Sequence, residues 1–149
     1  MATQGFEFAY MLDGSDAHPV IRDFAVDGTG AYAVGDLTLA NSDGQLASVS
    51  GTAAECTAII MEARASGGTD GDKVKAAILT RNQVWRCSMD DSSSAAKIGY
   101  TKKQDVANDH CLDADDTTNG SLIVVDTSTD DEGNVLGYVV FSDTTFGNA

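Results

Sequence analysis

Three adjacent residues, Asp109, His110 and Cys111, bring together the side chains that a cysteine hydrolase uses. Such a nucleophile needs a histidine base within hydrogen-bonding distance and a third group that orients the base. Neighbouring side chains of an extended chain point to opposite sides, so these three cannot adopt that arrangement among themselves. The sequence has a second histidine, His18, but no Gly-x-Ser-x-Gly nucleophile elbow. We therefore expect no catalytic residue and no enzyme activity.

Cysteines and carboxylates are also potential metal ligands. Structural zinc takes four ligands, usually in close pairs, whereas Cys56, Cys87 and Cys111 lie 31 and 24 residues apart (87 − 56 and 111 − 87). Their odd number argues against a closed disulfide framework and favours folding in a reducing compartment. The acidic stretches 113–120 and 126–133 resemble calcium loops, but neither has the glycine that an EF-hand carries at its sixth position. We expect solvated turns there, with no metal and no cofactor.

Charge and composition exclude further classes of function. The chain has 149 residues, with 9 Lys and Arg against 23 Asp and Glu, a net charge of −14, and 42% hydrophobic residues. This size and composition fit one globular domain. A surface so acidic repels nucleic-acid phosphates and anionic lipids, and no segment approaches the roughly 20 apolar residues of a membrane span. We expect no nucleic-acid or membrane partner, and synthesis in the cytoplasm.

Alternating or continuous apolar runs dominate the sequence and predict β-strands. Five segments show such a pattern clearly: residues 35–51, 73–80, 83–89, 121–126 and 135–141. The first, GDLTLANSDGQLASVSG, is typical of a hairpin whose Leu37 and Leu39 face the interior. We predict an all-β fold, a compact β-barrel or sandwich of short antiparallel strands, with an N-terminal arm and at most one short helix.

Residues 53–65 fit two structures about equally well. Thr52 and Glu55 have the spacing of a helix capping box, and the Ala, Glu, Met and Arg content favours a helix. The β-branched Thr57, Ile59 and Ile60 favour a strand instead. From the pattern alone both structures stay open, and the pattern also allows a short helical turn around residues 93–97.

The order of short motifs along the chain adds a resemblance. Pro-Val at residues 19–20 is followed by Val-Gly-Asp-Leu at 34–37, Ile-Gly-Tyr at 98–100 and Val-Val-Phe at 139–141. In this order, across residues 19–141, the chain resembles the small decoration, or cement, proteins of tailed-bacteriophage capsids. The resemblance favours a strand over a helix between Cys56 and Ala65.

The resemblance implies a structural protein of the virion. Such a protein is made in the cytoplasm of the host bacterium and binds the outer surface of the capsid. Its partner would be the major capsid protein, where capsomers meet, and it would hold the shell against the pressure of the packaged DNA. The resemblance also implies a homo-oligomer and favours a trimer.

Residues 1–22 are the candidate capsid-binding arm, and residues 23–149 form the single β-rich domain. Phe6, Phe8 and Tyr10 make an aromatic stripe that would lie on the partner, with Arg22 at the end of the arm. Aromatic residues and arginine are enriched at the centres of protein interfaces. The alternative is an ordinary first strand packed in the protein's own core.

Two rival interpretations remain. A carbohydrate- or cell-surface-binding β-module, dependent on calcium in the loop 113–120, would need an exposed aromatic platform that includes Trp85. Because Trp85 lies on a predicted strand flanked by apolar residues, we expect it in the core instead. The second rival is an enzyme of an unrecognised type, which requires a pocket with convergent polar groups.

Overall fold

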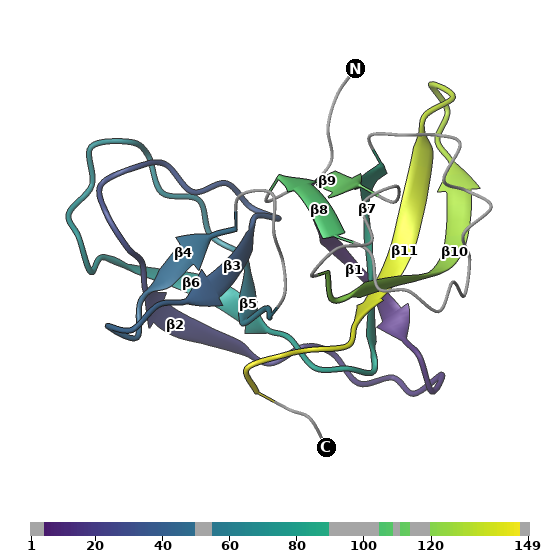
Figure 1. The fold of residues 1–149 in the computed structure, drawn as a ribbon, viewed down its shortest axis with the longest axis horizontal. Helices are drawn as coiled ribbons and strands as arrows, with labels where there is room; N and C mark the ends of the chain where they lie inside the picture. The colour runs from purple at the N-terminus through teal and green to yellow at the C-terminus, as the bar shows by residue number, and fades with distance from the viewer. Residues whose placement is uncertain (1–4, 50–54, 90–104, 109–110, 114–119, 147–149) are drawn as a thin grey trace.

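The computed structural model describes residues 5–49, 55–89, 105–108, 111–113 and 120–146. These form two β-sheets and contain no helix, which confirms the predicted all-β class. Sheet A has the strand order β10 (Leu122–Thr129), β11 (Val135–Phe141), β7 (Gln83–Met89), β9 (Cys111–Asp113) and β8 (Asp105–Asn108), and β1 (Glu7–Met11) also pairs with β7. Sheet B has the order β2 (Ile21–Ala25), β6 (Lys73–Ile78), β5 (Ala58–Ile60), β3 (Leu37–Ala40) and β4 (Leu46–Ser48) (Figure 1).

Strand β7 is the central strand of sheet A. Along one edge it pairs with β11, from Trp85 to Ser88. Along the other edge it pairs first with β1, antiparallel, and then with β9, which is parallel to it. Two strands from distant parts of the sequence therefore share one edge of β7 (Figure 1).

The main core lies between the two sheets, as in a β-sandwich. Sheet A contributes Trp85, Val139 and Phe141, while sheet B contributes Leu37 and Ile59, and all five are fully buried. The predicted burial of Trp85 is therefore confirmed, and this tryptophan forms no exposed platform. The C-terminal residue of β11, Phe141, packs its ring 5.6 Å from that of Phe6.

Sheet B has a second core on its other face. Its outer strands meet where Val26 bridges Leu46, so the sheet curls around Tyr32, Val74 and their apolar neighbours. Strand β5 contributes to both cores. Ile59 packs between the two sheets, whereas Ala58 and Ile60 pack in the second core, inside the curled sheet B. Ala58–Ile60 is thus a strand paired with β3 and β6, as the resemblance favoured, and not a helix. Residues 50–54, with Thr52 of the capping-box pattern, lie outside the described residues, as do residues 93–97.

The predicted hairpin is present. Strands β3 and β4 pair around the turn, where Asn41 Oδ1 accepts hydrogen bonds from the backbone N–H groups of Asp43 and Gln45. Gly44 has φ = 75°, a conformation that favours glycine. Leu37 is buried as predicted, whereas Leu39 near the end of the strand is exposed.

The N-terminal segment is a strand of sheet A, which is the alternative to a free arm. A β-bulge interrupts its alternation, because Phe8 lies opposite Trp85 and Tyr10 lies opposite Val84, with Ala9 as the extra residue. Phe6 and Met11 are buried, while Tyr10 is turned out to the opposite face. The boundary expected after residue 22 falls inside β2.

The side chain of Gln83 stabilises the corner where the chain passes from β6 of sheet B to β7 of sheet A. The buried Gln83 Oε1 accepts hydrogen bonds from the indole N–H of Trp85 (3.0 Å) and from the backbone N–H of Thr80 (3.2 Å). Its Nε2 donates to the carbonyl oxygen of Ile78 (3.0 Å). The side chain thus satisfies three polar groups of the corner at once.

The C-terminal segment returns from sheet A to sheet B. Cys56, just before β5, donates its N–H to the carbonyl of Asp143 (3.1 Å) and accepts a hydrogen bond from the N–H of Thr145 (3.0 Å). The hydroxyls of Thr57 and Thr145 are 2.7 Å apart. The segment after β11 therefore ties the two sheets together at a second place.

Replacing Gln83 with leucine is expected to destabilise the protein by about 2–4 kcal/mol, because the buried indole N–H and the Ile78 carbonyl lose their partner. Urea unfolding of the two proteins measures the difference. The matched control is Asn82→Ala in the same corner, an exposed position at which we expect a change within about 0.5 kcal/mol. Equal losses for the two variants would contradict the assigned role of Gln83.

Ending the chain after Ser142 removes the tie to Cys56 and is expected to cost about 2–3 kcal/mol of unfolding free energy. The control chain ends after Phe146 and keeps every contact described above, so its stability should equal that of the full chain. Thermal unfolding of the three proteins, monitored by circular dichroism, tests this. A shorter chain as stable as the control would show that the tie is dispensable.

Candidate binding surface

The structure separates the four residues predicted for capsid binding. Phe6 is only 3% exposed, and the ring of Phe8 packs edge-on against Trp85 at 5.6 Å, so both serve the protein's own core. Tyr10 is 43% exposed on the outer face of sheet A. Arg22 is exposed on β2 of the other sheet, opposite Ala76. A common surface of all four is therefore not present.

A ladder of polar side chains crosses the outer face of sheet A instead. Glu7 lies opposite Arg86 on β7, and Arg86 lies opposite Tyr138 on β11. Arg86 Nη2 donates a hydrogen bond to Glu7 Oε1 (2.6 Å), and Ser128 Oγ on β10 donates to the Tyr138 hydroxyl (3.2 Å). Four strands thus contribute one connected set of side chains, on the face opposite to Trp85.

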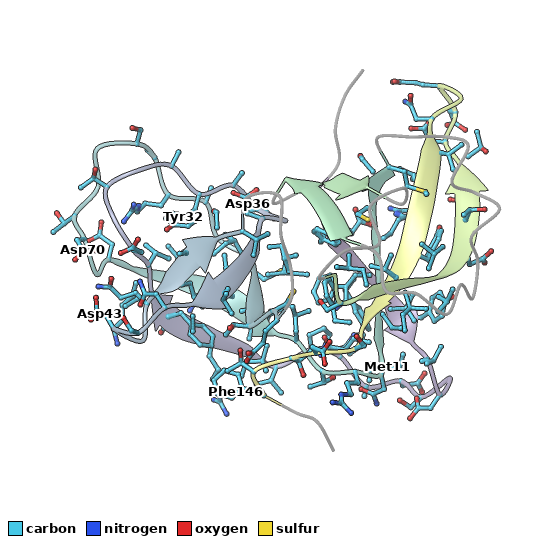
Figure 2. All side chains as sticks on the ribbon, in the orientation of Figure 1. Met11, Tyr32, Asp36, Asp43, Asp70 and Phe146 are labelled. Atoms are coloured by element: carbon cyan, nitrogen blue, oxygen red, sulfur yellow. The ribbon has the colours of Figure 1, made fainter. Side chains whose placement is uncertain are left out.

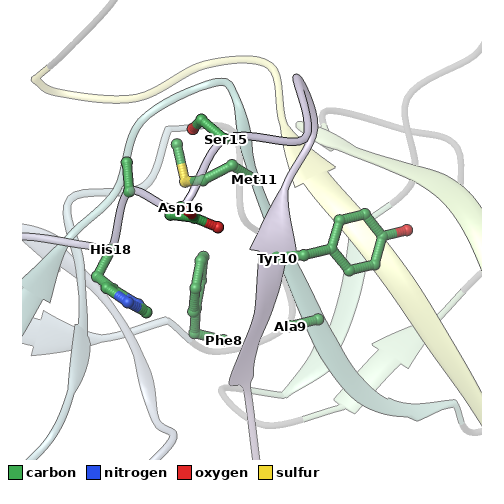
Figure 3. A pocket seen from close by; sticks show the side chains of 8 residues that line it. Phe8, Ala9, Tyr10, Met11, Ser15, Asp16 and His18 are labelled. Carbon is green, nitrogen blue, oxygen red and sulfur yellow. The ribbon is translucent and has the colours of Figure 1, made fainter.

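The exposed tyrosine joins this ladder. The rings of Tyr10 and Tyr138 stack at 6.3 Å between centroids with an angle of 30°. Figure 3 shows Tyr10 on the opposite side of β1 from Phe8 and Met11. Asp126 lies opposite Tyr138 in the register of β10 and β11. We call this set of side chains the tyrosine cluster: Glu7, Tyr10, Arg86, Asp126, Ser128 and Tyr138.

Two groups of the cluster have a raised pKa. Partial burial, together with the charge of Asp126 and the neighbouring Tyr138, raises the pKa of Tyr10 above its usual value. The hydrogen bond with Tyr138 and the charge of Glu7 raise the pKa of Arg86. Both groups therefore keep their protons at neutral pH, Tyr10 as a neutral phenol and Arg86 as a cation. Neither can act as a base there.

A depression of about 310 Å³ lies on the other side of β1. Its lining residues are Phe8, Ala9, Tyr10, Met11, Ser15, Asp16, Ala17 and His18. The His18 ring packs edge-on against Phe8 at 6.0 Å (Figure 3). In the described part of the chain, no hydrogen bond joins Ser15, Asp16 and His18, so the three do not form a catalytic triad.

Within the described ranges, no group of three or more His, Cys, Asp or Glu residues could hold a metal ion. Most of the loop 113–120 and both Asp109 and His110 lie outside those ranges, so the expected absence of a calcium site and of a catalytic site there stays a prediction. Cys56 and Cys87 are fully buried, and the sulfur of Cys56 lies 3.6 Å from the hydroxyl oxygen of Ser121. Among the residues that the structure covers, no helix is long and apolar enough to span a membrane.

A buried arginine fixes the loops at the far end of sheet B. The side chain of Arg64 is 9% exposed and donates hydrogen bonds to the carbonyl oxygens of Gly28 (3.0 Å) and Thr69 (3.2 Å). The guanidinium carbon of Arg64 lies 5.1 Å from the ring centroid of Tyr32, and its Nη1 lies 3.7 Å from Asp72 Oδ2. Tyr32 in turn donates its hydroxyl proton to the carbonyl of Asp27 (2.7 Å). Together these contacts hold the loops that contain Gly28 and Thr69 in a single conformation.

Sequence reasoning missed Arg86 and Tyr138. The available signal was the parity of each strand: in residues 83–89, Val84, Arg86 and Ser88 alternate with the core positions, which places Arg86 on the outer face. The continuous apolar run at 135–141 gives no such signal, although its central residue Tyr138 is only half-buried.

Comparison of the chain with protein-family models, with curated proteins and with solved structures gave no match.

Replacing Arg64 with alanine is expected to destabilise the protein by about 2–3 kcal/mol, because charge-assisted hydrogen bonds to several loop carbonyls are lost. Arg22→Ala is the matched control, since it removes an exposed arginine from the same sheet and should change stability by no more than about 0.5 kcal/mol. Urea unfolding measures both. A loss for Arg64→Ala no larger than that of the control would refute the role of Arg64.

Proposed function

We propose that this protein is a structural virion protein that binds the outer surface of a tailed-phage head between capsomers and stabilises the head against the pressure of its DNA. The partner is the major capsid protein, and the protein acts as a homo-oligomer, with a trimer favoured. Its place is the outer surface of the virion, after synthesis in the bacterial cytoplasm. The proposal extends the resemblance in motif order along residues 19–141.

The observation that carries the proposal is the way the two sheets are joined. They share the core around Trp85, and the Gln83 corner and the C-terminal tie connect them at two places. A protein that holds neighbouring capsid subunits together transmits force between its contact surfaces, so its own halves must not separate first. Several such subunits in one oligomer turn modest contacts into high avidity.

The net charge of −14 supports the same function. A protein on the outside of the head does not contact the packaged DNA, and an acidic outer surface limits the aggregation of particles. The alternative, a carbohydrate-binding module, requires an exposed aromatic platform that includes Trp85. Because Trp85 is fully buried, it cannot be part of such a platform.

The test mixes the purified protein with undecorated heads of the phage that encodes it and sediments the particles. We expect the protein to sediment with the heads up to a saturating ratio, and the decorated heads to release their DNA at a higher temperature than undecorated heads. An unrelated acidic protein of similar size serves as the control and should stay in the supernatant. If the protein also stays in the supernatant, the proposed function is wrong.

A further inference from the structure

The outer face of sheet A combines side chains that favour protein binding. Tyr10 and Tyr138 present stacked rings, and Arg86 lies between them and Glu7. Tyrosine and arginine are the residue types that contribute most often to binding energy at interfaces. On sheet B, the exposed aliphatic side chains of Val20 and Ile21 lie at the start of β2, next in sequence to the charged Arg22 and Asp23.

The cluster is ordered before any partner binds. Arg86 is fixed by its ion pair with Glu7 at 2.6 Å, the Tyr138 hydroxyl by Ser128 at 3.2 Å, and the Tyr10 ring by the stack with Tyr138. Side chains that are already fixed lose little conformational entropy on binding. The bulge at Ala9 is the reason that Tyr10 belongs to this face at all.

The charge around the rings indicates the chemistry of the partner. Asp126 is exposed opposite Tyr138, and Glu7 is exposed at the other side of the cluster. Arg86 is the cation described on this face, and Glu7 neutralises it. Among the residues that the structure describes, this face is therefore acidic around an aromatic centre, and a complementary partner presents lysine or arginine next to an apolar patch.

We propose that the tyrosine cluster is the surface that docks on the capsid subunit, and that it contacts a basic patch of that subunit. This inference rests on the proposed function and specifies the contact surface. The tyrosine cluster takes the place of the predicted N-terminal aromatic stripe of Phe6, Phe8 and Tyr10. Of these three residues, only Tyr10 belongs to the cluster. Because opposite charges attract through solvent at the rim of such a contact, binding weakens as salt is added.

The experiment measures binding of variants to undecorated heads by sedimentation at several protein concentrations. Tyr10→Ala and Asp126→Lys are expected to raise the apparent Kd at least tenfold. Phe146→Ala and Asp43→Lys are the matched controls. Phe146 is an equally exposed aromatic residue on the C-terminal segment, and Asp43 is on the β3–β4 turn at the far end of sheet B (Figure 2). The controls should bind like the wild type. Tyr138→Phe removes only the hydroxyl that Ser128 contacts; it is expected to weaken binding as well, and it keeps the test decisive if Tyr10→Ala does not fold.

The outcomes separate the two proposals. If the wild type binds heads and all variants bind equally well, the docking surface is wrong and the proposed function stands. If the wild type does not bind heads, both proposals fail. If light scattering shows that Tyr10→Ala dissociates the oligomer, the cluster is a contact between copies of the chain, and the inference is overturned. Binding of a glycan from an array that Tyr10→Ala abolishes would overturn it in favour of a carbohydrate site.

Discussion

The indole of Trp85 is the group around which the rest of the structure is arranged. A tryptophan that is fully buried must place a large apolar ring in the core and still find an acceptor for its one N–H group. Gln83, two residues away on the same strand, provides that acceptor and also bonds the corner that leads back to sheet B. The ring fills the space between the sheets, and its hydrogen bond fixes the place where the chain crosses from one sheet to the other.

The central position of β7 follows from the same residue. A strand with Trp85 and Cys87 on its inner face needs neighbours on both edges, since its backbone groups are buried as well. The hydrophobic residues of β1 and β11 meet this need, with Phe8 against the indole on one side and Val139 opposite Trp85 on the other. The outer face of the sheet then receives the side chains of opposite parity, and these include the members of the tyrosine cluster.

The cluster therefore depends on the core, although none of its rings lies in it. Arg86 reaches Glu7 and Tyr138 because β1 and β11 are held in register on either side of β7. At Ala9 the strand gains one residue, which lets Phe8 and Met11 both face inward and turns Tyr10 outward. The bulge in β1 thus places on this face the more exposed of the two tyrosine rings of the surface proposed to bind the capsid.

The all-β class, the hairpin after Gly35 and the burial of Trp85 could be predicted from the sequence, because alternation, turn residues and apolar content are local properties of the chain. The sequence left residues 53–65 open, since a segment buried on both faces shows no periodicity that distinguishes a strand from a helix. Only the tertiary structure decided that Ile59 and its neighbours serve two cores. It also decided which aromatic residues of the first strand are available to a partner. The physical reason is register: a one-residue shift at Ala9 changes the face of every later side chain, and contacts with β7, more than seventy residues away, select that shift.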